Sequence, residues 1–334
     1  MDTTPADRQA SRSSTVPAHP ATTHRALDAV SPVLRCPICL RALQREHTRL
    51  SCTERHRFDI ARQGYVNLTP GHVRHRGDTS AMVAARESFL SHGHYQPLVE
   101  TMRVLAVEHD PHSPGTVLDL AGGTGHYLAS VLNALPDRHG ICLDASTAAL
   151  RRAARAHPRA VAVGADAWQR WPLAAHSAST VINVFAPRNA AETRRVLTPD
   201  GIIITAAPAP EHLRELVGAL RMPTIDPHKT TRLAATFHQL DRLDSQLVAY
   251  RLGLDHAQVQ ALAGMGPAAR HTSTAALKQR ISHLPEPVGV TVAVEVTVHR
   301  MPDHRRAQSR RPSDRRPSDG DRSLRPRHPG ATLG

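Results

Sequence analysis

Between residues 116 and 300, short apolar runs alternate with longer segments in which apolar residues recur at helical spacing. This alternation is typical of a parallel sheet whose strands are covered by helices, so an α/β domain is expected. The apolar runs predict strands at Thr116–Leu120, Gly140–Asp144, Ala160–Gly164, Thr180–Phe185, Gly201–Ala206 and, in a strongly β-branched final run, Val288–His299.

The pattern changes on both sides of this domain. The start of the chain offers no periodic apolar face and predicts a disordered leader. A cysteine-containing module follows, then a basic connector with helices, the first from Ser80 to Leu90. The Arg/Pro-rich tail repeats Arg-Arg-Pro-Ser-Asp in tandem; nonspecific RNA attraction and a dispensable extension are both open for it. The expected divisions are 1–33 for the disordered leader, 34–70 for a zinc-binding RNA-recognition module, 71–115 for the connector and helices, 116–300 for the α/β domain and 301–334 for the disordered tail.

The charge of the chain suits a polyanionic partner. Its 334 residues include 42 Lys and Arg against 29 Asp and Glu, a formal net charge of +13. The alternative explanation of this excess of positive charge is a composition that is generally rich in Arg and Ala. Aromatic residues make up only 3% of the chain, so any platform for stacking RNA bases is small.

The compartment follows from what the chain lacks and from its cysteines. No apolar run approaches the roughly 20 residues of a membrane span. The polar N-terminus has no apolar core of a secretory signal. Three of the four cysteines are clustered, which favours a metal site over a disulfide framework. A cytoplasmic protein is therefore expected.

A glycine-rich turn follows the first predicted strand. In Thr116-Val-Leu-Asp-Leu-Ala-Gly-Gly-Thr-Gly125, the apolar strand ends near Asp119 and a helical segment, residues 126–135, begins after the turn. Glycines at such a turn let the backbone approach a ligand without a Cβ in the way. The turn alone would also suit a dinucleotide, or an α/β domain that binds no nucleotide.

The next two strands narrow the choice of ligand. The second ends at Asp144, about 25 residues after Asp119, where a carboxylate accepts both hydroxyls of a ribose. The third is followed by Asp166, which is placed to read an adenine edge. Three successive strands with carboxylates at their ends resemble the S-adenosylmethionine-dependent methyltransferases. A nicotinamide enzyme fits this order less well, because no pyrophosphate here needs the helix dipole. Ala121 departs from their pattern, which normally has glycine at that position.

Three cysteines and a histidine have the spacing of a structural zinc site. Cys36 and Cys39 enclose Pro-Ile; twelve residues then lead to Cys52, and three more to His56. Four such protein ligands hold one tetrahedral zinc ion and leave no position open for catalysis. A module this small needs the metal to fold. His47 is an alternative fourth ligand, and the many arginines of the module either contact phosphate or form a solvated face.

Uncommon strings outside the cofactor turn carry a more specific resemblance. One runs from Cys52 to Leu68 as C-x3-H-x-F-D-x-A-x2-G-Y-V-N-L, and another is Gly77-Asp-x3-Met82. A third runs from Ala85 to Leu98 as A-R-x2-F-L-x2-G-H-Y-Q-P-L. With the cofactor turn, these strings are similar to the bacterial 23S ribosomal RNA guanine-N1 methyltransferases over about residues 34–300. Some actinobacterial members of that family confer resistance to tylosin- and mycinamicin-type macrolides.

The resemblance implies a dimeric enzyme that methylates N1 of one guanosine in hairpin 35 of 23S ribosomal RNA. Its fold would be a Rossmann-like S-adenosylmethionine methyltransferase sheet with an N-terminal zinc-ribbon module. By position, the implied zinc ligands are Cys36, Cys39, Cys52 and His56, and the implied contacts to S-adenosylmethionine are Tyr95, Gly123, Thr124 and His212. With the turn and the strand ends, the predicted cofactor-binding set is Tyr95, Asp119, Gly122, Gly123, Thr124, Gly125, Asp144, Asp166 and His212.

The fourth predicted strand carries the candidates for substrate contact. N1 of guanine is protonated at neutral pH and lies on the pairing edge, so the base must leave its stack and lose a proton. Asn183 is predicted to hydrogen-bond the base and Phe185 to stack on it; the alternative is a buried strand end without ligand contact. Asp166 is a candidate for the base that takes the proton, although adenine reading suits it better. The competing functions are a small-molecule methyltransferase of natural products and a catalytically inactive RNA-binding protein, which only Ala121 supports.

Overall fold

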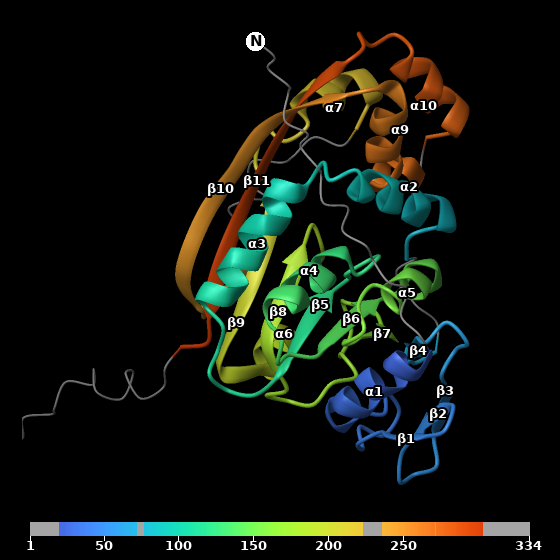
Figure 1. Cartoon of the computed structure of the whole chain (residues 1–334), viewed down its shortest axis with the longest axis vertical. Helices are drawn as coiled ribbons and strands as arrows, with labels where there is room; N and C mark the ends of the chain where they lie inside the picture. The colour runs from blue at the N-terminus through green and yellow to red at the C-terminus, as the bar shows by residue number, and fades with distance from the viewer. Residues whose placement is uncertain (1–19, 72–76, 223–235, 271, 303–334) are drawn as a thin grey trace, which may run out of the picture. The chain divides into compact units, whose positions relative to one another are not determined.

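The computed structural model describes residues 20–71, 77–222, 236–270 and 272–302. Its main element is an eight-stranded sheet with the order β10-β11-β9-β8-β5-β6-β7-β4 (Figure 1). The strands are β4 (Val66–Asn67), β5 (Thr116–Leu120), β6 (Gly140–Asp144), β7 (Ala160–Gly164), β8 (Ala178–Val184), β9 (Leu197–Pro208), β10 (Asp241–Leu254) and β11 (Val288–Arg300).

Five of the six strands predicted from apolar runs, β5 to β9, form the parallel centre of the sheet. β5, β6 and β7 have the predicted bounds and are buried along their whole length, as expected for strands covered on both faces. Neighbouring residues face opposite sides: Val117 packs into one core and Leu118 into the other. The predicted α/β architecture is confirmed.

The edge formed by β10 and β11 is antiparallel, which the prediction of a parallel sheet did not include. β11 runs antiparallel to β9, and β10 runs antiparallel to β11 along their full length. The sequence prediction missed β10 because most of its positions are exposed and polar residues interrupt its apolar ones. A long hairpin of this kind extends the sheet without a crossover helix.

Helices cover both faces of the sheet. One core joins the sheet to α3 (Gln96–Glu108), α4 (His126–Ala134), α5 (Thr147–Ala153), α7 (Arg214–Leu220), α9 (His256–Gly264) and α10 (Thr274–Ile281). The other core joins it to α1 (Pro20–Val30), α6 (Ala190–Val196) and the cysteine-containing segment. None of the described helices is long and apolar enough to cross a membrane.

The predicted disordered leader, 1–33, is wrong for its last part. Residues 20–30 form α1, a 3-10 helix η1 (Ser31–Val33) follows, and α1 packs against β7. Ala26, Leu27 and Val30 lie on one helical face and are buried, but three apolar positions are too few to be recognised in a polar segment. Residues 1–19, the connector residues 72–76 and the tail from 303 lie outside the described residues.

The cysteine-containing segment is a small antiparallel sheet that continues into the large one. β1 (Gln44–Glu46), β2 (Arg49–Ser51) and β3 (Arg57–Asp59) form the small sheet. β4 then pairs in parallel with β7. The chain next reaches α2 (Ser80–Ser91), whose predicted start at Ser80 is confirmed and is capped by the hydroxyl of Thr79.

Candidate cofactor cavity and zinc centre

A cavity of about 470 Å³ opens at the carboxyl ends of β5, β6, β7 and β8. This is where a parallel sheet binds its ligands, and the volume suits a nucleoside-sized molecule. Of the predicted cofactor residues, the lining includes Tyr95, Asp119, Gly122, Gly123, Asp144, Asp166 and His212. Thr124 and Gly125 lie in the turn beside the lining.

The turn after β5 needs its glycines for two different reasons. A Cβ on Gly122 would come within 2.5 Å of the Asp119 carboxyl group, and Gly123 has a φ of +58°. A Cβ on Gly123 would also lie 2.9 Å from Nη1 of Arg86. Glycine therefore gives the turn both its left-handed backbone and the space beside its neighbours.

Ala121 has a φ of +51° in this turn, so its backbone is strained where glycine would not be. We expect Ala121→Gly to raise the thermal midpoint slightly, because relief of about 1 kcal/mol is partly offset by a more flexible unfolded chain. Cofactor affinity should stay within about threefold, since the loop keeps its conformation. Calorimetry measures both quantities; an affinity gain above tenfold in Ala121→Gly would show that Ala121 impairs the natural site.

Asp119 places an unsatisfied carboxylate on the cavity. Its side chain is 1% exposed, and Oδ2 has no hydrogen-bond partner among the described residues. Burial, with a smaller contribution from the charge of Asp144, raises the pKa of Asp119 to about 7. A buried acceptor without a donor fits a cationic ligand group such as an ammonium.

Asp144 and Asp166 stand at the ends of the next two strands. Oδ2 of Asp144 accepts from the Gly123 N–H at 2.9 Å, and Oδ1 accepts from the Ser146 N–H at 2.7 Å. Burial still raises the pKa of Asp144 above its usual value. Oδ1 of Asp166 accepts from the Trp168 N–H at 2.9 Å. With Asp119, these residues bring three carboxyl groups to one end of the cavity.

Three rings form a second side of the cavity. Phe185 and His212 stack with centroids 5.7 Å apart, and Tyr95 lies 6.2 Å from Phe185 and 6.4 Å from His212. Burial lowers the pKa of His212 to about 4, so this imidazole is neutral. Its Nδ1 accepts from the Ala293 N–H at 3.3 Å, which leaves the proton on Nε2.

Asn183 requires a correction to the predicted substrate contacts. It is 1% exposed, it is absent from the cavity lining, and its Nδ2 donates to the Pro187 carbonyl at 2.7 Å. Its amide therefore fixes the backbone after β8 and lies outside the cavity lining. Phe185 does line the cavity, is 44% exposed and has a φ of +52°, a left-handed backbone that projects its ring from the strand end.

Sequence reasoning missed a charged cluster at the cavity. Asp78 forms ion pairs with Arg86 at 2.6 Å and with Arg270 at 3.3 Å, and all three line the cavity. Arg86 also donates to the Met265 carbonyl at 3.0 Å. Asp78 and Arg86 are close in sequence and lie in the uncommon strings, whereas Arg270 is almost 200 residues away, so sequence did not show that the three side chains meet.

The four predicted zinc ligands come together in the module. Their ligand atoms all lie within 4.8 Å of one another. Sγ of Cys39 and Cys52 are 3.6 Å apart, and Nδ1 of His56 is 3.5 Å from Sγ of Cys36 and of Cys52. A zinc tetrahedron with Zn–S bonds of about 2.3 Å has S–S edges of nearly this length, whereas a disulfide is far shorter. His47 has a φ of +54° between β1 and β2 and lies outside the group.

Comparison with known proteins agrees with this architecture. Residues 34–76 match the family model described as "RlmA, N-terminal", a zinc ribbon, and residues 117–201 match the model described as "Methyltransferase domain". A Streptomyces fradiae protein named 23S rRNA (guanine(748)-N(1))-methyltransferase is 42% identical over 269 residues, covering 80% of this chain and 96% of the relative. The chain belongs to the family of 23S ribosomal RNA guanine-N1 methyltransferases. It thus has the fold of an S-adenosylmethionine-dependent methyltransferase and an N-terminal zinc ribbon.

Two further relatives carry the family name. A Micromonospora griseorubida protein named as a 23S rRNA (guanine-N1)-methyltransferase is 44% identical over 287 residues, covering 80% of this chain and 97% of the relative. A Bacillus subtilis protein with the same type of name is 28% identical over 277 residues, covering 80% and 95%. Each match covers 80% of this chain and at least 95% of the relative, so nearly the whole length of each relative has a counterpart in this methyltransferase.

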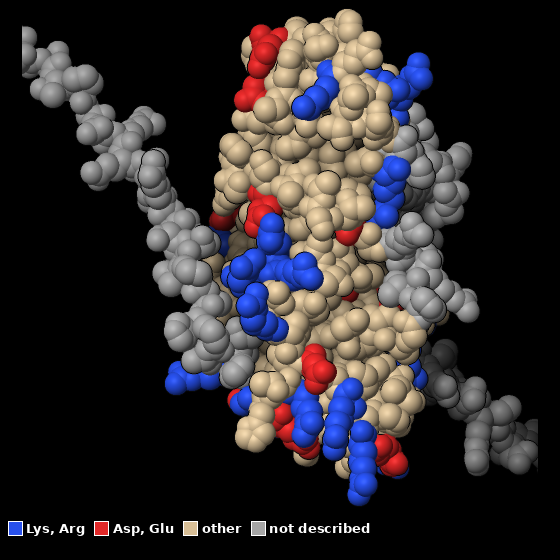
Figure 2. Space-filling model, turned by 90° about the vertical axis from the view of Figure 1, so that its right-hand side faces the viewer, with Lys and Arg blue, Asp and Glu red and all other residues tan. Residues whose placement is uncertain are grey.

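The methyltransferase also presents exposed basic groups. Figure 2 shows a dense group of basic side chains near the middle of one face and a second group, mixed with acidic ones, at its lower end. In the zinc ribbon, Arg41, Arg45 and Arg49 are occupied by ion pairs with acidic neighbours. Other arginines are exposed and form no ion pair within the described chain. They include Arg55, Arg57 and Arg62 in the ribbon, Arg151 in α5 and Arg155 just after α5.

Proposed function

We propose that this protein transfers the methyl group of S-adenosylmethionine to N1 of a guanosine in hairpin 35 of 23S ribosomal RNA. The observation that carries the proposal is the unsatisfied, buried carboxylate of Asp119 beside a glycine turn, in a chain that is 42% identical to a named guanine-N1 methyltransferase. Such an acceptor fits the ammonium of the cofactor's methionine moiety. Modification at this site would protect the ribosome against tylosin-type macrolides, and the enzyme would work in the cytoplasm, where its substrate is.

In this proposal, the cofactor supplies the electrophilic methyl group, and the chain supplies orientation and desolvation. Asp119 holds the ammonium, while Asp144 and Asp166 hold the adenosine. Tyr95 and His212 close the other side with neutral groups. The remaining cofactor contacts, Gly122, Gly123, Thr124 and Gly125, bring the backbone of the turn against the ligand.

Phe185 is proposed to stack on the flipped guanine because its ring is exposed at the cavity. His212 is a poor base for the N1 proton, since burial lowers its pKa to about 4 and its Nδ1 already accepts a backbone N–H. Asp166 stays a candidate for this base, although adenine reading is the role that suits it better. The unpaired arginines Arg55 and Arg155 are proposed to contact phosphates of the hairpin.

Phe185→Leu tests the stacking role. We expect methylation of RNA to fall at least about tenfold, because stacking of a base on an aromatic ring contributes about 1–3 kcal/mol. Phe185→Tyr keeps the ring and should keep most of the activity, and both variants should bind S-adenosylmethionine like the natural protein. Equal activity of the leucine and tyrosine variants would remove Phe185 from the substrate site.

The function itself is tested with labelled S-adenosylmethionine and unmodified 23S RNA. We expect 1-methylguanosine in hairpin 35, identified by mass spectrometry after digestion, and no product with RNA that carries adenosine at the target. Cofactor binding without RNA labelling would favour the small-molecule methyltransferase, and loss of both would favour an inactive RNA-binding protein. A homodimer is also proposed; sedimentation of the protein alone measures it.

A further inference from the structure

The cavity has two walls that the sheet does not join directly. One wall, residues 165–168, follows β7, and the other, residues 184–187, begins at the last residue of β8. In the sheet, β5 and β6 lie between β8 and β7, so no backbone ladder connects the two walls. Their separation therefore depends on side chains or on the segments that follow them.

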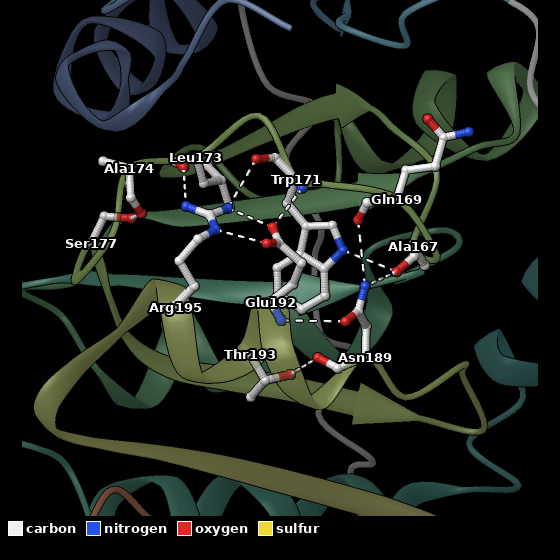
Figure 3. A network of polar contacts seen from close by, with 10 residues as sticks. All are labelled: Ala167, Gln169, Trp171, Leu173, Ala174, Ser177, Asn189, Glu192, Thr193 and Arg195. Atoms are coloured by element: carbon white, nitrogen blue, oxygen red, sulfur yellow. Dashed lines mark hydrogen bonds and ion pairs between the residues drawn. The ribbon is translucent and has the colours of Figure 1, made fainter. Parts of the chain in front are cut away.

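Asn189 links the two walls through its side chain. It follows the second wall after one residue and caps α6, where its Oδ1 accepts from the Glu192 N–H at 3.3 Å. Its Nδ2 donates to the carbonyl of Ala167 in the first wall at 3.3 Å and to that of Gln169 at 3.4 Å. Figure 3 shows the amide of Asn189 reaching both carbonyl groups from the start of α6.

The rest of α6 holds the continuation of the first wall. Oε2 of Glu192 accepts from the Trp171 N–H at 2.8 Å. Arg195 donates to the Leu173 carbonyl at 2.7 Å and to the Trp171 carbonyl at 3.0 Å, while it pairs with Glu192 (Figure 3). The Glu192 and Arg195 side chains are only 13% and 18% exposed. The backbone from residue 167 to 173 is therefore bound to one helix, with Asn189 at the end nearest the second wall.

We propose that Asn189 is a positioning residue for methyl transfer, which sets the separation between the wall at 165–168 and the wall at 184–187. The inference rests on the proposed function, in which Asp166 of the first wall contacts the cofactor and Phe185 of the second contacts the guanine. In-line transfer tolerates little misalignment, and a displacement of about 1 Å costs on the order of 100-fold in rate. Releasing the walls lowers turnover more than cofactor affinity, because Asp119 and Asp144 keep their places.

Asn189→Asp separates this role from helix capping. Aspartate keeps the acceptor for the Glu192 N–H and is an equally good N-cap, so α6 stays capped. The Nδ2 donor, however, is replaced by an oxygen that repels the carbonyls of Ala167 and Gln169. In single-turnover methylation of 23S RNA at saturating cofactor, we expect the rate to fall at least tenfold, with the cofactor dissociation constant within threefold of the natural value.

Ser273→Ala is the control for a general loss of stability at a helix cap outside the cavity. Ser273 caps α10 through the Ala276 N–H at 3.2 Å and does not line the cavity. This variant should lower the thermal midpoint and leave the methylation rate unchanged. A rate within twofold of natural in Asn189→Asp, an equal loss of rate and cofactor affinity, or the same loss of rate in Ser273→Ala would overturn the proposal.

Failure of the proposed function is distinguishable from failure of this inference. If the natural protein does not methylate RNA, the function is wrong, and the link between the walls is tested by amide hydrogen exchange. Exchange at residues 165–170 should then be at least tenfold faster in Asn189→Asp than in the natural protein. Unchanged exchange there would overturn the inference in its structural form as well.

Discussion

Asp119→Asn is expected to weaken S-adenosylmethionine binding by about 30-fold while it makes the ligand-free protein more stable above pH 7. The loss of affinity follows from removing a charge-assisted hydrogen bond, which contributes about 1.5–3 kcal/mol. The gain in stability follows from removing a buried carboxylate whose pKa is raised from 3.8 to about 7. Carrying that charge above pH 7 costs on the order of 4 kcal/mol. Titration calorimetry and thermal unfolding measure the two effects on the same samples.

Stability and cofactor affinity should both depend on pH, each with a definite sign. Because the pKa of Asp119 is raised, the natural protein loses stability from this group as pH rises from about 4 to about 7, and Asp119→Asn should not show that loss. Cofactor affinity of the natural protein should rise over the upper part of the same range, since binding favours the ionised carboxylate and releases a proton. Flat affinity between pH 6 and 8, or a variant less stable than the natural protein at pH 8, would contradict the assignment.

Loss of zinc is expected to unfold the zinc ribbon and to abolish RNA methylation. Structural zinc contributes on the order of 10 kcal/mol to small modules, and this ribbon has only three short strands of its own. Cys52→Ser should therefore contain less than one zinc per chain and unfold in an additional transition at lower temperature. Metal content by mass spectrometry and calorimetric unfolding check the result.

His56→Ala and His47→Ala form a matched pair for the fourth ligand. His56 lies with the three cysteines, whereas His47 lies outside the group. We expect His56→Ala to lose zinc under mild chelation and His47→Ala to retain it. Retention by both variants would mean that three cysteines suffice, and loss in His47→Ala alone would restore His47 as the ligand.

The parts of the molecule that sequence predicts best depend on local patterns. β5, β6 and β7 are short, wholly buried apolar runs. The candidate ligand-binding residues lie at the end of each strand or in the turn after it, close together in sequence. The zinc ligands likewise occupy two short segments. The four zinc ligands between Cys36 and His56 could therefore be predicted from their spacing, and the structure brings them together.

The parts that sequence did not predict depend on contacts between distant segments. Arg270 meets Asp78 and Arg86 only because η2 (Pro267–Arg270) and α2 lie over the same cavity. Asn183 and Asn189 are both polar residues near a strand end, and sequence could not show that both bind backbone carbonyls. β10 could not be predicted from an apolar run, because an edge strand needs few buried positions and most residues of β10 are exposed.

The pairing of β4 with β7 has a consequence for target choice. Since the zinc ribbon passes directly into the edge of the catalytic sheet, it cannot swivel about a free linker without breaking that pair. In the proposed function, the ribbon would therefore hold the RNA at a fixed distance from the cavity in which a base is methylated. Neighbouring guanosines in one hairpin would then be distinguished by their distance along the RNA. To make such an enzyme methylate another guanosine, the distance between the ribbon and the cavity would have to change before the cavity itself.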